Sequence, residues 1–313
     1  MKILITGGLG YVGGRLVEYF QNKRPEQALI LTTTRNNFPS WAKENNVVFM
    51  DLAKQESIAH CLQNTQPDIV IHLAAMPQKQ CELDSEKALA VNAEGTRHIL
   101  EMADQTGVKR FIYFSTFQVY GQLKGEISEE NSPNPKNIYA ESKLKAENII
   151  CEFVSKQKMQ KLIFRLSNGF GYPQDENVGE NIWGLAFNAF CRRCFADGVI
   201  SIDSNQYRDF ITLEDVTRAV DHLLFLKPND WRDGLFNLGG NCCLSILEVA
   251  KRVSQVYAKY YQRSLEIKTL HDHFERFHYC VDKLQSTGFE WKGNSEEEIL
   301  KTLQLCERLY MTT

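Results

Sequence analysis

The sequence lacks a marked excess of charge of either sign. Its 313 residues hold 36 lysines and arginines against 39 aspartates and glutamates, which gives a formal net charge of -3. This balance provides no basic stripe for nucleic acid and no polybasic patch for a membrane surface. Apolar runs of membrane-spanning length are also missing, and the run Ile3–Ile5 is far shorter than the apolar core of a secretion signal. We therefore expect a cytoplasmic protein that binds neither nucleic acid nor a membrane.

The sequence also lacks the cysteine pattern of a disulfide framework. Its nine cysteines are an odd number scattered along a large chain, which favours a reducing compartment. Cys191 and Cys194 form a Cys-x-x-Cys pair, but they lie in a helix-like stretch, 182–196, without the Pro or Gly setting of a redox turn. The candidate metal ligands are His271, Asp272, His273, His278 and Cys280. The His-x-His spacing within them more often marks a polar strand or loop. We predict no metal site.

The most informative feature that is present is a glycine-rich turn near the start of the sequence. An apolar run over 2–6 breaks into glycines at positions 7, 10 and 13 and continues as an amphipathic helix. Glycines let the backbone turn sharply and approach a ligand closely. Free amides and the positive dipole end of a helix N-terminus favour a pyrophosphate. A dinucleotide is the natural occupant of such a turn.

Apolar runs alternate with helical patterns over the first 170 residues. This alternation requires crossover connections and predicts an α/β fold with a doubly wound parallel sheet of the Rossmann type. The expected strands are 2–6, 28–32, 47–50, 69–73, 110–115 and 161–166, and the expected helices are 10–21, 86–106 and 137–156.

After Gly169 the pattern changes. Irregular polar stretches are expected at 174–181 and 201–209, and helices at 213–225, 245–261 and 295–310. We expect a dinucleotide-binding domain over 1–170 and a smaller substrate-binding subdomain over 171–313. The boundary is soft, and C-terminal segments can return to the sheet.

Tyr139 and Lys143 stand four residues apart in the run Tyr-Ala-Glu-Ser-Lys. In a helix, side chains at this spacing project from one face. A nearby ammonium stabilises the phenolate and lowers the tyrosine pKa from about 10 toward the pH at which the group transfers protons. By itself, this pair recurs by chance in many sequences.

The pair belongs to a series of motifs that occur in one order. The series is Thr6-Gly-Gly-Leu-Gly-Tyr-Val-Gly13, Asp51-Leu52, His72-Leu-Ala-Ala75, Asn92 with Gly95-Thr96, Ser115-Thr116 with Val119-Tyr-Gly121, Tyr139 to Lys143, Arg165-Leu-Ser-Asn168 and Arg208-Asp-Phe210. Through this series, essentially the whole chain resembles the extended short-chain dehydrogenase/reductase family of nucleotide-sugar epimerases, dehydratases and reductases.

The resemblance implies three catalytic residues. Tyr139 would exchange a proton with a sugar hydroxyl while hydride moves to or from the nicotinamide. Lys143 would hold the nicotinamide ribose and lower the pKa of Tyr139, and Thr116 would bind the same substrate oxygen.

The resemblance also implies binding residues. Those for the cofactor are Gly7, Gly10, Tyr11, Val12, Gly13, Thr33, Arg35, Asp51, Leu52, Leu73, Ala74, Ala75, Asn92, Tyr139, Lys143 and Leu166. Those for a nucleotide-diphosphate sugar are Thr116, Asn168, Asn181 and Arg208. The guanidinium of Arg208 suits the diphosphate. Trp183 either lies at the start of the helix that covers the sugar nucleotide or is a core residue.

One departure from the family patterns concerns the cofactor. Thr33, Thr34 and Arg35 follow the second strand where an NAD enzyme would carry an acidic residue. A carboxylate there would repel a 2′-phosphate, whereas Arg35 and the threonine hydroxyls could bind one. We favour NADP(H) over NAD(H); the alternative is that Arg35 stacks on adenine and NAD(H) is used.

A second departure concerns the reaction. Phe117 and Gln118 replace the Asp-Glu pair of the 4,6-dehydratases, and neither can transfer a proton, so dehydration is disfavoured. Two reactions need no more than Thr116, Tyr139 and Lys143: 4-ketoreduction and 4-epimerisation. The NADP-like pocket favours the ketoreductase slightly, because an exchangeable NADPH pool supplies net reduction. A non-catalytic dinucleotide sensor is less expected, because the tyrosine-lysine pair is retained.

Family members commonly pair through two long helices. Here those are 86–106 and 137–156, so we expect a homodimer through a four-helix bundle.

Overall fold

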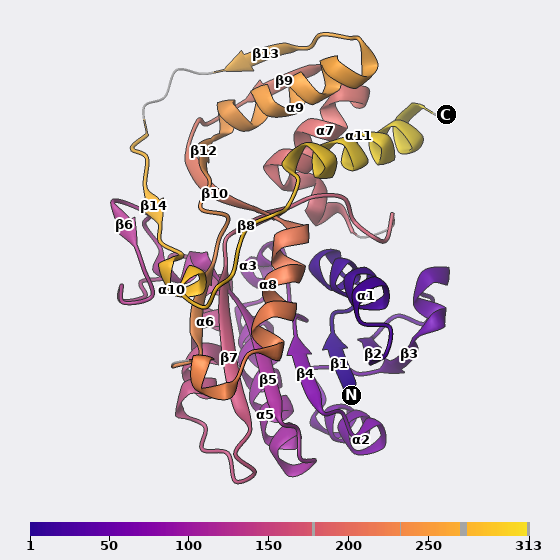
Figure 1. Ribbon diagram of the computed structural model, residues 1–313, viewed down its shortest axis with the longest axis vertical. Coiled ribbons are helices and arrows are strands. Elements are labelled where there is room, and N and C mark those ends of the chain that lie inside the picture. The colour runs from indigo at the N-terminus through magenta and orange to yellow at the C-terminus, as the bar shows by residue number, and fades with distance from the viewer. Residues whose placement is uncertain (177–178, 232, 270–273, 312–313) are drawn as a thin grey trace. The chain divides into compact units, whose positions relative to one another are not determined.

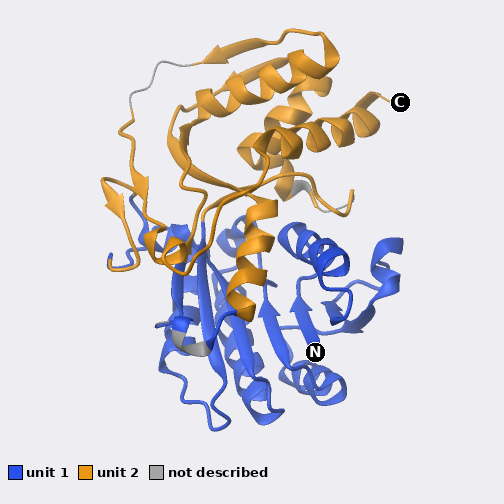
Figure 2. Ribbon diagram, in the orientation of Figure 1, with its two compact units in different colours: residues 1–122, 131–166, 226–236 blue, residues 123–130, 167–225, 237–313 orange. Residues whose placement is uncertain are grey.

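The computed structural model describes residues 1–176, 179–231, 233–269 and 274–311 of the chain (Figure 1). The chain divides into two compact units (Figure 2). Unit 1 comprises residues 1–122, 131–166 and 226–236, and unit 2 comprises residues 123–130, 167–225 and 237–313. Each unit is therefore assembled from stretches that are separate in the sequence.

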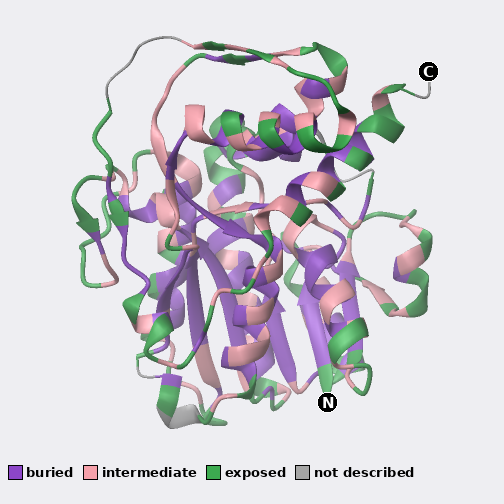
Figure 3. Cartoon of the chain, turned by 45° about the horizontal axis from the view of Figure 1, so that its top comes forward, coloured by how far each residue is buried: buried purple, intermediate pink, exposed green. Residues whose placement is uncertain are grey.

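A seven-stranded sheet forms the centre of unit 1. Its order is β11-β7-β5-β4-β1-β2-β3. The strands are β1 (Lys2–Thr6), β2 (Ala28–Thr33), β3 (Asn46–Phe49), β4 (Ile69–His72), β5 (Arg110–Thr116), β7 (Gln160–Leu166) and the edge strand β11 (Leu235–Leu238). The pairs from β7 to β3 are all parallel. The central strands are buried (Figure 3), as their near-continuous apolar sequences predict. The predicted doubly wound parallel sheet is confirmed.

Helices cover both faces of this sheet because the strand order reverses direction. The chain moves outward from β1 to β2 and β3 and then returns past β1 to β4 and β5. Right-handed crossovers therefore place the first helix on one face and the later helices on the other. These helices are α1 (Tyr11–Lys23), α2 (Gln55–Thr65), α5 (Gly95–Gln105) and α6 (Ile138–Glu152). α2 packs on α5 and α5 on α6, and their apolar sides form a core with the sheet.

The region between β4 and β5 differs from the single predicted helix over 86–106. It contains α3 (Gln78–Leu83), α4 (Ser85–Leu89), a π-helical turn η2 (Ala90–Glu94) and α5. Asp84 separates α3 from α4, because its carboxylate accepts the N–H of Lys87 at 2.9 Å and caps α4. The π-helical turn carries Asn92, which binds two neighbouring segments. Such turns are frequent at functional sites.

α6 ends at Glu152, four residues before the predicted end at 156. The carboxylate of Asp104 accepts the N–H groups of Lys156, at 3.0 Å, and Gln157, at 3.2 Å, which holds this segment out of the helix. The ammonium of Lys161 binds carbonyl groups of the last helical turn. These long-range contacts override the local helix propensity.

Unit 2 contains short strands and several helices among its described residues. The strands form β12-β10-β8 (Cys243–Ser245, Tyr207–Thr212, Asn168–Phe170), β13-β9 (Glu266–Thr269, Val199–Ile202) and β14-β6 (His278–Tyr279, Glu126–Ile127). The helices are α7 (Ala186–Ala196), α8 (Leu213–Phe225), α9 (Ile246–Tyr261), α10 (Asp282–Gln285) and α11 (Ser295–Met311). The predicted helices of this region are confirmed. The prediction of an irregular stretch over 201–209 is wrong, because β9 ends and β10 begins within it.

Short 3-10 helices complete the description. They are η1 (Ser40–Glu44), η3 (Phe117–Tyr120), η4 (Glu180–Gly184) and η5 (Pro228–Trp231). Within the described residues, no helix is both long enough and apolar enough to cross a membrane. All nine cysteines are free thiols, and Cys191 and Cys194 are buried in α7.

Candidate active site

The glycine-rich turn joins β1 to α1 in a conformation that requires glycine. Gly7 has a φ of 68°, and a Cβ there would lie 3.0 Å from the backbone nitrogen of Ala74. A Cβ on Gly13 would lie 2.2 Å from the carbonyl oxygen of Gly7. The turn therefore packs closely against α1 and the end of β4. Gly10 is the N-cap of α1 and has no side chain to bind the first helical N–H groups, which suits this end of the helix to a phosphate.

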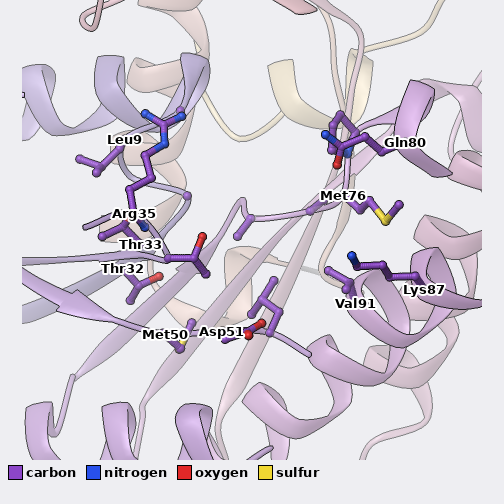
Figure 4. Close-up of a pocket in the computed structure, with 17 residues that line it drawn as sticks. Leu9, Thr32, Thr33, Arg35, Met50, Asp51, Met76, Gln80, Lys87 and Val91 are labelled. Carbon is purple, nitrogen blue, oxygen red and sulfur yellow. The ribbon is translucent and has the colours of Figure 1, made fainter. Parts of the chain in front are cut away.

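A cavity of about 400 Å³ opens beside this turn in unit 1 (Figure 4). It lies at the carboxyl ends of β1 to β4, where open α/β sheets bind ligands. Eight of the predicted cofactor-binding residues line it: Gly7, Gly10, Thr33, Arg35, Asp51, Leu52, Ala74 and Ala75. Thr34, whose hydroxyl was expected to help bind a 2′-phosphate, also lines it, and sequence reasoning missed Leu9, Thr32, Met50, Met76, Pro77, Gln80, Lys87 and Val91. Most of these are chain neighbours of predicted positions, but no motif marks Gln80 and Lys87 on α3 and α4.

The charged groups of the cavity are predominantly cationic. Arg35 and Lys87 contribute positive charge from the two sides seen in Figure 4, and Asp51 contributes the carboxylate of the lining. That carboxylate accepts the N–H of Ala53 at 3.0 Å and lies 3.8 Å from the ammonium of Lys54. A cavity with this charge balance favours a phosphorylated ligand.

A buried histidine holds the loop after β4 in place. The ring of His72 is 2.6 Å from the hydroxyl of Thr6 and 3.0 Å from the hydroxyl of Thr96. The Thr6 hydroxyl also accepts the N–H of Ala74 at 3.0 Å, so β1, β4 and α5 are tied together next to the cavity. Burial, together with the charge of Lys143, lowers the pKa of His72 to about 3. The imidazole is therefore neutral at neutral pH.

The other predicted cofactor residues do not line this cavity: Tyr11, Val12, Gly13, Leu73, Asn92, Tyr139, Lys143 and Leu166. Asn92 is buried, and its side-chain amide accepts the N–H of Met76 at 2.6 Å and donates to the hydroxyl of Ser142 at 2.9 Å. Asn92 thus connects the loop after β4 to α6, the helix that carries Tyr139 and Lys143.

Thr116, Tyr139 and Lys143 all belong to unit 1. Thr116 is the last residue of β5, and its hydroxyl oxygen accepts the N–H of Gln118 at 3.2 Å. Tyr139 lies in the first turn of α6, close after the N-cap residue Asn137. The side-chain amide of Asn137 donates to the side-chain carbonyl of Gln118 at 3.0 Å. This bond joins the segment that follows Thr116 to the start of the helix that carries Tyr139 and Lys143.

The ionisation of Tyr139 differs from the sequence-based expectation. Burial raises the pKa of Tyr139 to about 12, which opposes the lowering expected from Lys143. Lys143 is itself buried, with 2% of its surface exposed, and burial lowers its own pKa to about 7. Near neutral pH the amine therefore carries a partial positive charge on average. Its nitrogen lies 4.2 Å from the ring centre of Tyr113, a favourable position for an ammonium.

A buried ion pair lies on the same helix and was missed from the sequence. Glu147 on α6 binds Arg165 on β7, with 2.7 Å between Oε2 and Nη2, and both side chains are at most 5% exposed. The hydroxyl of Ser115 on β5 donates to the same carboxylate. Arg165 and Ser115 stand in motifs of the resemblance, but Glu147 does not. Its spacing of four residues from Lys143 is the signal that could have found it.

Three of the four candidate substrate residues, Asn168, Asn181 and Arg208, lie in unit 2, whereas Thr116 lies in unit 1. Asn168 on β8 donates its amide to a backbone carbonyl of β10 at 2.9 Å. Arg208 on β10 binds the side chain of Gln206 and a backbone carbonyl of its own strand. Asn181 is exposed in η4. Trp183 is 8% exposed and belongs to the core.

Candidate metal ligands do not converge in the described part of the chain. There, no group of three or more His, Cys, Asp and Glu residues is arranged to hold a metal ion. Residues 271–273 of the predicted His-x-His run lie outside the described residues.

Comparisons with known proteins support the family resemblance. The model of the NAD dependent epimerase/dehydratase family matches residues 3–239. A dTDP-D-glucose 4,6-dehydratase of Dictyostelium discoideum is 28% identical over 277 residues, which cover 82% of this chain and 62% of that protein.

Two solved structures share the fold. A UDP-glucose 4-epimerase of Thermus thermophilus in complex with NAD has a TM-score of 0.80 and 22% identity, covering 98% of this chain and 99% of that one. RMD from Pseudomonas aeruginosa complexed with NADPH has a TM-score of 0.80 and 24% identity, with the same coverage of 98% and 99%. At these identities, the two structures establish the architecture.

Proposed function

The chain belongs to the NAD dependent epimerase/dehydratase family, and we propose that it is an NAD(P)-dependent enzyme that reduces a 4-keto group of a nucleotide-diphosphate sugar. One observation carries the proposal. Thr116 and the Tyr139–Lys143 pair sit at the joined ends of β5 and α6, in the same unit as the glycine-rich turn and its cavity. Hydride transfer to a carbonyl needs a proton donor for the oxygen and a bound dinucleotide for the hydride.

The cavity residues fit a nicotinamide dinucleotide. Gly7, Gly10 and Gly13 allow close approach of a pyrophosphate to the start of α1. Asp51 and Leu52 would border the adenine, and the residues after β4 would border the ribose and nicotinamide. When bound, the cofactor supplies or accepts the hydride.

The charges of the cavity favour NADP(H) over NAD(H). Arg35 and Lys87 are two cations in the lining, and the carboxylate of Asp51 is already bound by a backbone N–H. A 2′-phosphate near Thr33 and Arg35 would gain charge-assisted hydrogen bonds there. NAD(H) lacks that phosphate and would gain less.

The chain's own residues provide the proton transfer. Tyr139 would donate its phenolic proton to the carbonyl oxygen as hydride reaches the carbon, which converts the ketone to an alcohol. The oxygen of Thr116 already accepts the N–H of Gln118, so its hydrogen is available to donate to the same substrate oxygen. The ammonium of Lys143 would stabilise the phenolate that remains.

Dehydration is not part of the proposal, although the Dictyostelium relative is named a 4,6-dehydratase. Phe117 and Gln118 follow Thr116 in this chain, and neither side chain can take up or release a proton near neutral pH. The carbonyl of Gln118 is instead used to bind Asn137. The remaining alternative is a 4-epimerase that uses the same three residues.

Arg208 of unit 2 would bind the diphosphate of the nucleotide-diphosphate sugar, and Asn168 and Asn181 of the same unit would bind further substrate groups. We also propose a homodimer through α5 and α6 and a cytoplasmic location. Glu94, the last residue of η2, lies 2.9 Å from Arg97 on α5 and 3.4 Å from Lys145 on α6 in ion pairs within the chain. Sedimentation of the purified chain tests the dimer.

The deciding experiment incubates the chain with a panel of 4-keto and 4-hydroxy sugar nucleotides and NADPH. Loss of NADPH absorbance together with a product heavier by two hydrogens supports the ketoreductase. An isomerised product at constant NADPH absorbance would instead identify a 4-epimerase. A product lighter by one water molecule would identify a dehydratase. Thermal stabilisation by ligands without any product would indicate a dinucleotide sensor.

A further inference from the structure

Three charged side chains are buried together around α6. Lys143 and Glu147 are one helical turn apart on this helix, and Arg165 reaches Glu147 from β7. Their exposed fractions are 2% for Lys143, 3% for Glu147 and 4% for Arg165. Buried charges of this kind require partners.

The carboxylate of Glu147 is held by groups from two strands. The guanidinium of Arg165 binds it through Nη2 at 2.7 Å and through Nε at 3.2 Å to each oxygen. The hydroxyl of Ser115 binds it from β5, one residue before Thr116. The guanidinium also lies over the ring of Tyr120, at 4.7 Å. The carboxylate is therefore fixed in position.

The groups around Lys143 make its charged form depend on Glu147. Arg165 binds the carboxylate of Glu147 directly, and Lys143 lies one helical turn from it. The other titratable groups near Lys143 are the thiol of Cys81 on α3, the imidazole of His72 on β4, Tyr113 on β5 and Tyr139 on the same helix. Burial raises the pKa of the thiol and of both phenols and lowers that of the imidazole, so all four are neutral near pH 7. The carboxylate of Glu147 is then the group whose negative charge favours the ammonium form of Lys143.

We propose that Glu147 is a positioning residue of this active site, whose carboxylate, fixed by Arg165 and Ser115, keeps Lys143 in its ammonium form one helical turn from Tyr139. The inference rests on the proposed function for its catalytic meaning, because the ammonium is the group that would stabilise the Tyr139 phenolate. The Glu147–Arg165 pair does more than join α6 to β7: it sets the pH range over which the amine is charged.

The ionisation of Lys143 agrees with this assignment. Burial lowers its pKa to about 7, and the charge of Glu147 opposes that shift. An opposite charge one helical turn away contributes on the order of 1 pH unit or more in a buried site. Without it, Lys143 would be mostly neutral at pH 7, and the phenolate would lose its stabilising charge.

The test separates this role from a purely structural one. The single variant Glu147→Gln leaves Arg165 buried without its carboxylate, so it destabilises the fold for structural reasons alone. The double variant E147Q/R165Q replaces the ion pair by two neutral amides and restores a balanced pair. Glu147→Asp keeps the charge and serves as the conservative variant. The matched control is D68N/K109Q, which removes an ion pair of 2.8 Å that joins the starts of β4 and β5.

The readout is the titration midpoint of Lys143 itself, measured by nuclear magnetic resonance on protein with isotope-labelled lysine. The signal is assigned by its loss in K143R. We expect a midpoint near 7 in the native protein, in E147D and in the D68N/K109Q control. In E147Q/R165Q it should fall by less than the roughly 1 pH unit that the carboxylate alone contributes, because the variant also removes the nearby cation of Arg165. An unchanged midpoint in the double variant overturns the proposal, as does a native midpoint near that of free lysine.

Turnover provides a second readout, which, unlike the titration of Lys143, depends on the proposed function. If a sugar nucleotide is reduced, kcat should decline with rising pH in both enzymes. In the double variant this decline should begin at a lower pH than in the native enzyme, with cofactor affinity nearly unchanged. If no substrate of the panel turns over, the proposed function fails, while the titration of Lys143 still decides the role of Glu147. Turnover with unshifted pH dependence and midpoint rejects the role of Glu147 alone.

Discussion

Unit 1 and unit 2 hold their proposed ligand-binding groups in different ways. In unit 1, the cavity is fixed by steric constraints at Gly7 and Gly13 and by the buried bonds of His72. In unit 2, Arg208 binds a side chain two residues away and its own strand, and Asn181 is exposed. The comparison indicates that packing forms the proposed dinucleotide site before any ligand binds. The proposed sugar-nucleotide residues would instead exchange their local hydrogen bonds for bonds to a ligand.

The largest expected effect comes from Tyr139→Phe, which removes the proton donor and leaves the cavity of unit 1 intact. Turnover should fall by about 1,000-fold, because general acid catalysis of this type contributes on the order of 100- to 10,000-fold. Steady-state kinetics with the substrate found in the panel measures the loss, and NADPH titration should give nearly native affinity. A native rate would remove Tyr139 from the mechanism.

Gly13→Ala tests whether the cavity of unit 1 depends on close packing. The added Cβ would lie 2.2 Å from the carbonyl oxygen of Gly7, so the turn must shift. We expect a loss of about 1–3 kcal/mol in unfolding free energy and a large loss of NADPH affinity.

The matched control in unit 2 is Gly184→Ala, where the Cβ meets no atom within 4 Å. Its unfolding free energy should stay within about 0.5 kcal/mol of native. Urea unfolding measures both variants, and equal stabilities would contradict the steric argument.

Arg208→Gln tests the proposed role of unit 2. Loss of charge-assisted hydrogen bonds to a diphosphate should raise KM for the sugar nucleotide by about 10- to 100-fold. The affinity for NADPH should not change, because that ligand is assigned to unit 1. A loss of NADPH affinity in this variant would contradict the assignment of the dinucleotide to unit 1 and of the sugar nucleotide to unit 2.

Arg35→Gln sharpens the assignment of the cofactor within unit 1. The dissociation constant for NADPH should rise by about 10-fold, as expected for one bond to a charged group. That for NADH should barely change, since it carries no 2′-phosphate. Fluorescence titration with both cofactors measures the ratio, and an equal loss for both would favour stacking of Arg35 on adenine.

The last prediction concerns the pH dependence of stability set by the buried histidine of unit 1. The pKa of His72 is about 3 in the folded state and about 6.5 when unfolded, so between these values the unfolded chain binds a proton that the folded chain does not. Native stability should therefore fall with decreasing pH by about 1.4 kcal/mol per pH unit more than that of His72→Asn. Denaturant unfolding from pH 7 to pH 4 measures the difference, and parallel curves would refute it.

The two units also differ in how well their secondary structure can be predicted from the sequence. The central strands β1, β4 and β5 of unit 1 are apolar and buried, so the sequence pattern predicts their positions, whereas the strand β3 near the sheet edge is partly exposed. α2 was missed because its apolar positions, Ile58, Cys61 and Leu62, are few among polar residues. In unit 2, β9 and β10 are short and pair with segments distant in the sequence, and no local pattern specifies such pairing.

The candidate site divides in a similar way. The glycines and the Tyr139–Lys143 pair are recognisable because their chemistry needs fixed residue types at fixed spacing. Lys87 enters the cavity because a π-helical turn and two short helices bend the chain between β4 and β5. The pKa values of Tyr139 and Lys143 depend on burial by segments far apart in the sequence, and the sequence contains no direct sign of that burial.

The position of β11 at the margin of the sheet has a consequence for biosynthesis. Residues 226–236 belong to unit 1 but leave the ribosome some sixty residues after β7, the strand that β11 flanks. Until they emerge, β7 is an edge strand of the nascent chain, with unpaired backbone N–H and C=O groups. Such a strand can pair with strands of other chains. Stalled or truncated translation products that end between these two strands should therefore be the species most prone to aggregate.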